Sequence, residues 1–103
     1  MKGSSTNLAQ SATDSAPHTP HLPPYTEYRD GELCVEGVSL SSVAARFGTP
    51  TYVYSRRSIV ERFGAFAHAF SQPGEFVCVS VKANSNLSLL KLLAERGSGF
   101  DVV

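Results

Sequence analysis

The fold is decided by residues 76–86, which read Phe-Val-Cys-Val-Ser-Val-Lys-Ala-Asn-Ser-Asn. The first six of these residues are almost continuously apolar, which is typical of a parallel strand that is buried on both faces. Lys82 follows the strand directly, and residues 83–86 form a polar turn. In β/α folds, the carboxyl ends of parallel strands collect ligand-binding and catalytic groups. The stretch therefore predicts a strand that ends at a candidate functional lysine.

The residues upstream of this strand predict a strand and then a helix. Residues 51–54 are β-branched or aromatic, which favours a strand. A helix should begin at Ser55 or Ser58, and Ser58 with Glu61 would form a capping box. Its apolar stripe recurs at helical spacing and consists of Ile59, Phe63, Phe66 and Phe70. Pro73 and Gly74 mark the turn into the central strand.

The downstream residues continue the alternation. A helix is expected from about Asn86 to Arg96, with Gly97 ending it, and residues 99–103 begin another strand. This order implies right-handed βαβ crossovers and a parallel α/β sheet. A complete eight-stranded β/α barrel needs about 250 residues. We therefore expect this chain to be the front part of a larger protein and to fold poorly alone.

Residues 25–48 predict a hairpin followed by a short helix. Asp30-Gly31 is a strong two-residue turn signal within a hairpin over residues 28–37. Ser39 or Ser41 can cap the following helix, and Gly48 suits its C-terminal left-handed position.

Residues 1–24 contain four of the six prolines and few large aliphatic residues, so we expect a disordered leader. His18 and His21 lie in this leader. They are interpreted as solvated histidines, because a metal site needs a third or fourth ligand on a rigid frame.

Composition excludes several classes of protein. Nine Lys and Arg residues balance nine Asp and Glu residues, so no net charge steers the 103-residue chain toward nucleic acid or anionic lipid. No apolar run approaches the roughly 20 residues that span a bilayer. No secretory signal is visible, and a cytoplasmic location is expected. Cys34 and Cys78 are too few for a disulfide scaffold or a zinc site, and Cys78 is expected to be a buried structural thiol.

Two interpretations of Lys82 are open from the residues alone. A partly dehydrated ammonium has a lowered pKa, and the neutral amine can condense with an aldehyde. Alternatively, the side chain only extends from the strand end to solvent, which spacing alone favours. Asp101 is the second candidate. It lies in the next strand, where it approaches Lys82, or else faces solvent or caps a loop.

Four segments in order resemble the N-terminal region of bacterial diaminopimelate decarboxylases, which are alanine-racemase-like, fold-type III pyridoxal phosphate enzymes. The segments are residues 28–33, 47–54, 79–86 with Leu89-Leu90, and 97–103. The resemblance covers residues 25–103. One departure is Ser80, where the family usually has Ala, and a buried hydroxyl needs a partner.

The resemblance implies pyridoxal 5′-phosphate as cofactor and decarboxylation of meso-2,6-diaminoheptanedioate to L-lysine and CO₂, the last step of lysine biosynthesis. Lys82 matches the lysine that holds the cofactor, and Asp101 matches an acidic position close to it. Residues 49–103 would begin a TIM-type (β/α)₈ barrel, and residues 25–48 would belong to a second, β-rich domain and a linking helix. The complete enzyme would be a homodimer that acts on a small amino-acid substrate, whereas the 103 residues alone should be inactive.

Two alternatives remain besides a ligand-free scaffold. The same architecture also serves ornithine and arginine decarboxylases, and a non-catalytic or regulatory pyridoxal phosphate-binding barrel would retain Lys82. The matches at residues 28–33 and 47–54 favour the diaminopimelate branch.

Overall fold

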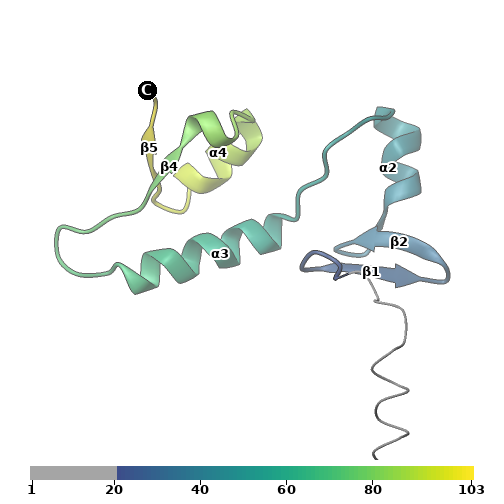
Figure 1. Ribbon diagram of the computed structural model, residues 1–103, viewed down its shortest axis with the longest axis horizontal. Helices are drawn as coiled ribbons and strands as arrows, with labels where there is room; N and C mark the ends of the chain where they lie inside the picture. Colours follow the sequence, from purple (N-terminus) through teal and green to yellow (C-terminus); the bar gives the residue numbers. More distant parts are fainter. Residues whose placement is uncertain (1–20) are drawn as a thin grey trace, which may run out of the picture.

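A computed structural model describes residues 21–103 of the chain. The elements form an N-terminal group and a C-terminal group, with the longest helix, α3, running between them (Figure 1). In chain order they are β1 (Thr26–Arg29), β2 (Glu32–Val35), β3 (Val38–Ser39), α2 (Leu40–Phe47), α3 (Arg56–Ala69), β4 (Cys78–Ser80), the 3₁₀ turn η1 (Val81–Ala83), α4 (Leu87–Ala94) and β5 (Gly99–Asp101).

The N-terminal group confirms the predicted hairpin. β1 and β2 pair antiparallel around Asp30 and Gly31, whose φ angles of 49° and 80° are those of a tight hairpin turn. The sequence analysis missed a second turn at Glu36 and Gly37, with φ angles of 48° and 80°. This turn adds the two-residue strand β3 to the sheet. A strand this short has no alternation of apolar and polar residues to reveal it.

Ser39 joins this sheet to helix α2. Its Oγ accepts a hydrogen bond from the Ser42 N–H at 3.1 Å, which confirms Ser39 as the N-cap. The same hydroxyl donates to the Glu32 carboxylate, and this bond, with a second from Ser41, lowers the pKa of Glu32. Cys34 is buried in the same group, at 5% exposure. The hairpin and α2 therefore form one small packed unit.

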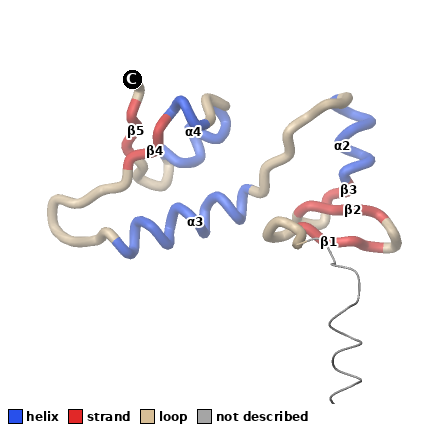
Figure 2. Tube along the Cα trace, in the orientation of Figure 1, coloured by secondary structure: helices blue, strands red, loops and turns tan. Residues whose placement is uncertain are grey.

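The predicted strand over residues 51–54 is not present as a strand. Residues 51–55 carry no regular structure (Figure 2), and Tyr52 is 88% exposed. A strand needs a neighbouring strand to satisfy its backbone groups. Among residues 21–103, none pairs with this segment, so β propensity alone does not make it a strand.

Helix α3 begins three residues earlier than a Ser58 cap would allow. The Ser58 N–H donates to Ser55 Oγ at 3.0 Å, so Ser55 is the N-cap. The proposed capping box of Ser58 and Glu61 is therefore wrong. Glu61 instead contacts Tyr25 and Arg57.

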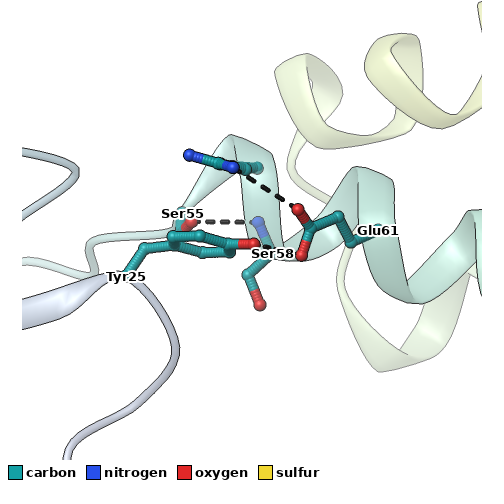
Figure 3. Close-up of polar contacts among 5 residues, drawn as sticks. Tyr25, Ser55, Ser58 and Glu61 are labelled. Carbon is teal, nitrogen blue, oxygen red and sulfur yellow. Dashed lines mark hydrogen bonds and ion pairs between the residues drawn. The ribbon is translucent and has the colours of Figure 1, made fainter.

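Glu61 connects α3 to the N-terminal group through Tyr25 (Figure 3). The Tyr25 hydroxyl donates to Glu61 Oε2, and the Arg57 guanidinium lies 4.6 Å from the centre of the Tyr25 ring. Arg57 Nε also pairs with Glu61 Oε1 at 3.4 Å. Sequence analysis missed this cluster because Tyr25 and Glu61 are 36 residues apart, and no local spacing indicates such a contact.

The elements are arranged as an extended body. The radius of gyration is 20.6 Å, whereas a compact domain of 100 residues has about 13 Å. Cys34 and Leu93 are the buried hydrophobic residues of the described chain. Large apolar side chains remain exposed on α3 and in the segment that precedes β4. Phe66 of α3 is 58% exposed, and Phe76, two residues before β4, is 73% exposed. This arrangement agrees with an α/β chain whose core needs further partners.

The Tyr25–Glu61 contact should be visible in the titration of Tyr25. The hydrogen bond to Glu61, followed by desolvation and the glutamate charge, raises the pKa of Tyr25 above its usual value of 10.0. We expect Glu61→Gln to lower this pKa. The contact should contribute fully to stability below about pH 10 and be lost as the pH rises through the folded-state pKa.

Ultraviolet titration, with Tyr25→Phe identifying the signal of Tyr25, measures this shift. Glu95→Gln is the control, because Glu95 lies at the end of α4 and makes no hydrogen bond or ion pair with Tyr25. An unchanged Tyr25 pKa in Glu61→Gln would contradict the contact.

Candidate functional site at the end of strand β4

The predicted parallel strand pair is present in the C-terminal group. β4 and β5 pair parallel, with Cys78 opposite Gly99, Val79 opposite Phe100 and Ser80 opposite Asp101. Helix α4 makes the connection between them (Figure 1). The carboxyl ends of both strands therefore lie at one edge of the pair. This βαβ unit positions the candidate site.

The two faces of the strand pair differ in what covers them. Val77 and Val79 line an apolar groove together with Leu93 of α4 and the stripe of α3, represented by Ile59, Phe63 and Phe66. Because strand side chains alternate between faces, Cys78 and Ser80 lie on the opposite face. Their register partners Gly99 and Asp101 share that face with them. One face thus packs toward the helices, and the other carries the candidate polar groups.

The two strands approach closely at Gly99. A Cβ atom there would lie 2.7 Å from Cys78 Sγ and 3.2 Å from Phe76 Cε2, so the position has no room for a side chain without rearrangement. Cys78 itself is exposed. The expectation of a buried thiol at Cys78 is therefore wrong, because residues 21–103 leave this side chain open to solvent.

Lys82 lies in the turn η1, immediately after β4, as the sequence predicts. Its side chain is exposed. The dry environment expected around the amine is therefore not formed by the described residues. β4 is also shorter than the predicted strand 76–81 and is not buried on both faces. Both differences have one cause: the only strand paired with β4 in this part of the chain is β5.

The turn after Lys82 is held by two asparagine side chains. Asn84 Oδ1 accepts from the Asn86 N–H at 3.0 Å. Asn86 Oδ1 accepts from the N–H groups of Ser88 and Leu89 at 3.0 and 3.2 Å, so Asn86 is the N-cap of α4. These bonds fix the path of the chain between the lysine and the helix. The predicted helix start is confirmed.

Asp101 is the last residue of β5, and its side chain is exposed. Its Oδ1 accepts from the Val103 N–H at 3.3 Å. No ion pair joins Asp101 to Lys82 in the part of the chain that the structure describes. The fold therefore brings both residues to the same edge of the strand pair, as predicted, but not into contact.

Ser80 is the third polar residue at this edge. Its Oγ is buried and has no hydrogen-bond partner among residues 21–103. The sequence predicted that this hydroxyl would need a partner, and the described chain does not supply one.

Metal-binding clusters and membrane-spanning helices are both absent from the described residues. No group of three or more His, Cys, Asp or Glu side chains within residues 21–103 could hold a metal ion. His18 lies outside the described residues, as does most of the predicted leader, so both interpretations stay predictions. In the same range, no helix has the length and apolar character that crossing a membrane requires.

Comparison with known proteins assigns the edge that carries Lys82 to a family. Residues 56–103 match the family described as "Pyridoxal-dependent decarboxylase, pyridoxal binding domain". The matched region begins with α3 and includes the whole βαβ unit, with Ser80, Lys82 and Asp101. The region that carries these residues is therefore similar to the pyridoxal-binding domain of that family.

The curated relatives narrow the family to one kind of enzyme. The chain is 58% identical over 80 residues to diaminopimelate decarboxylase from Aquifex aeolicus, and 57% identical over 76 residues to the enzyme from Pseudomonas aeruginosa. These alignments cover 78% and 74% of this chain but 19% and 18% of the relatives. The chain thus spans about a fifth of their length. It is a homologue of diaminopimelate decarboxylases, and the resemblance found in the sequence is confirmed.

Solved structures agree with this relationship. A crystal structure of an Aquifex aeolicus protein matches with a TM-score of 0.72 at 57% identity, over 78% of this chain and 20% of that chain. Diaminopimelate decarboxylase from M. jannaschii matches with a TM-score of 0.69 at 35% identity, over 77% of this chain and 20% of that chain. The described elements therefore have the arrangement found in these proteins.

These relationships imply pyridoxal phosphate as the cofactor. The described residues fit it. Lys82 offers an exposed primary amine at the end of β4. Ser80, two positions earlier, offers a buried hydroxyl that has no hydrogen-bond partner among residues 21–103.

The N-cap at Asn86 should stabilise the turn that carries Lys82. Asn86→Ala removes the acceptor of two backbone N–H groups, and loss of such a cap costs about 1 kcal/mol of unfolding free energy. Asn86→Asp keeps a capping oxygen and should retain most of the stability. Denaturant unfolding of both variants checks this. Equal stability of Asn86→Ala and the wild type would show that the cap contributes nothing.

Proposed function

We propose that this chain forms the N-terminal part of a pyridoxal phosphate-dependent diaminopimelate decarboxylase, which converts meso-2,6-diaminoheptanedioate to L-lysine and CO₂. The observation that carries the proposal is the position of Lys82, an exposed amine at the carboxyl end of β4, within the matched pyridoxal-binding region. Two further findings support the substrate. Curated relatives at 57–58% identity are diaminopimelate decarboxylases, and a solved M. jannaschii enzyme was crystallised with L-lysine.

Lys82 and Asp101 each have a role in the proposal. Lys82 would hold the cofactor through its ε-amine. Asp101 lies at the same strand end, where its negative charge favours the protonated form of the nearby nitrogen. When bound, pyridoxal phosphate withdraws the negative charge that loss of CO₂ leaves on the substrate.

The proposed architecture follows from the same fold. β4, α4 and β5 would be β/α units of a TIM-type barrel that begins at residue 49, and residues 25–48 would belong to a second, β-rich domain. The unpaired segment 51–54 and the second edge of β4, which has no partner strand among residues 21–103, support this proposal, because both need neighbouring strands. The Tyr25–Glu61 contact would join the two domains.

The setting of the enzyme is also proposed. The complete enzyme would be a homodimer with a small amino-acid substrate. It would act in the cytoplasm, and the two free cysteines, Cys34 and Cys78, are in keeping with a reducing compartment.

Substrate specificity is tested by CO₂ release. The complete enzyme, loaded with pyridoxal phosphate, should release CO₂ from meso-2,6-diaminoheptanedioate much faster than from ornithine or arginine, because the relatives are diaminopimelate enzymes. Preference for ornithine or arginine would place the chain in another branch of the same fold. Cofactor uptake without CO₂ release from any of the three would indicate a non-catalytic barrel.

The covalent anchor is tested by trapping. Borohydride reduction of the loaded complete enzyme, followed by peptide mass mapping, should place the pyridoxyl group on Lys82. Lys82→Ala should lose the label and the visible absorbance of the bound cofactor while remaining folded, because Lys82 is exposed. Lys91→Ala is the matched control, because Lys91 lies on α4. A label on another lysine would refute the assignment.

A further inference from the structure

Ser80 has an unusual hydroxyl group. Its Oγ is buried, yet no atom of residues 21–103 accepts a hydrogen bond from it or donates one to it. Most buried side-chain polar atoms in proteins have at least one partner, and each exception calls for an explanation. A hydroxyl that is buried without a partner lowers stability relative to a methyl group of similar size. The anchoring chemistry assigned to Lys82 does not account for it.

The position of Ser80 limits what its partner can be. Ser80 is the last residue of β4 and precedes Lys82 by two positions. It lies on the face of the strand pair that turns away from the apolar groove, opposite Asp101 in the parallel register. A partner must therefore approach from the side of the strand pair where the candidate polar groups lie.

Asp101 is the nearest acceptor by register, but the structure does not pair the two residues. The Asp101 carboxylate instead accepts from the Val103 N–H at 3.3 Å, and Ser80 Oγ makes no bond to it. An acceptor atom of a bound ligand accounts for the unpaired hydroxyl better than the Asp101 carboxylate does. A molecule attached to Lys82 would lie near this end of β4, because Lys82 follows Ser80 by two positions.

We propose that the Ser80 hydroxyl donates a hydrogen bond to an acceptor atom of the pyridoxal ring of the bound cofactor. This inference rests on the proposed function, since it requires pyridoxal phosphate at Lys82. Ser80 is then a cofactor-binding residue. This hydrogen bond explains why a hydroxyl is tolerated at the end of a strand that is otherwise apolar.

The test compares two serine variants of the complete enzyme. Ser80→Ala removes the unpaired hydroxyl, and Ser98→Ala is the matched control. Ser98 lies in the same βαβ unit, and its hydroxyl already donates to the Gly99 carbonyl at 2.7 Å. For each protein, thermal unfolding is measured without cofactor, and the dissociation constant of pyridoxal phosphate is measured by absorbance titration.

The two variants should behave in opposite ways. Without cofactor, Ser80→Ala should be as stable as the wild type or more stable, because no hydrogen bond within the protein is lost. Its dissociation constant for pyridoxal phosphate should rise about three- to tenfold, as expected for one hydrogen bond. The rise in melting temperature on adding cofactor should shrink accordingly. Ser98→Ala should lose stability without cofactor and keep the wild-type dissociation constant.

Several outcomes would overturn the inference. If Ser80→Ala is less stable than the wild type without cofactor and binds pyridoxal phosphate equally well, the hydroxyl is bonded within the protein, with Asp101 as the first candidate. An unchanged dissociation constant with unchanged stability also overturns it. A wild-type enzyme that takes up no pyridoxal phosphate would instead refute the proposed function, which is a distinct result.

Discussion

The parallel pairing of β4 with β5 is the constraint on which the candidate site depends. It sets Ser80 opposite Asp101 and brings the ends of both strands to the edge where Lys82 lies. The close approach of the strands relies on Gly99, because a side chain there would meet Cys78 and Phe76. Helix α4 and the asparagine-held turn complete the connection between the strands. Without this pairing, Asp101 would not reach the strand edge where Ser80 and Lys82 lie.

The second constraint is the contact between the N-terminal group and α3. Tyr25 has a φ angle of 62°, which residues other than glycine rarely adopt. Its hydroxyl bonds to Glu61, and Arg57 covers its ring. The contact combines a hydrogen bond with a cation–π interaction, and an ion pair within α3 joins Arg57 to Glu61. It holds the hairpin against the beginning of the helix that precedes the strand with the lysine.

Local signals in the sequence predicted most elements, and their failures share a physical cause. Asp30-Gly31, the serine before α2, the asparagine before α4 and Gly97 act through nearby backbone atoms, so the residues themselves reveal them. The segment 51–54 and the environment of Lys82 depend on other strands, which residues 21–103 do not provide. The site was therefore predicted in position but not in burial. The Tyr25–Glu61 contact joins residues too distant in sequence for any local pattern.

The two cysteines of the chain lie in opposite environments. Cys34 is buried within the hairpin unit, whereas Cys78 is exposed on the face of β4 that turns away from the apolar groove. A thiol reagent would therefore modify Cys78 readily and Cys34 only when the hairpin opens. Any layer that later covers that face of β4 must protect Cys78 as well. The pair thus provides a built-in chemical reporter that distinguishes assembly around the strands from unfolding of the hairpin.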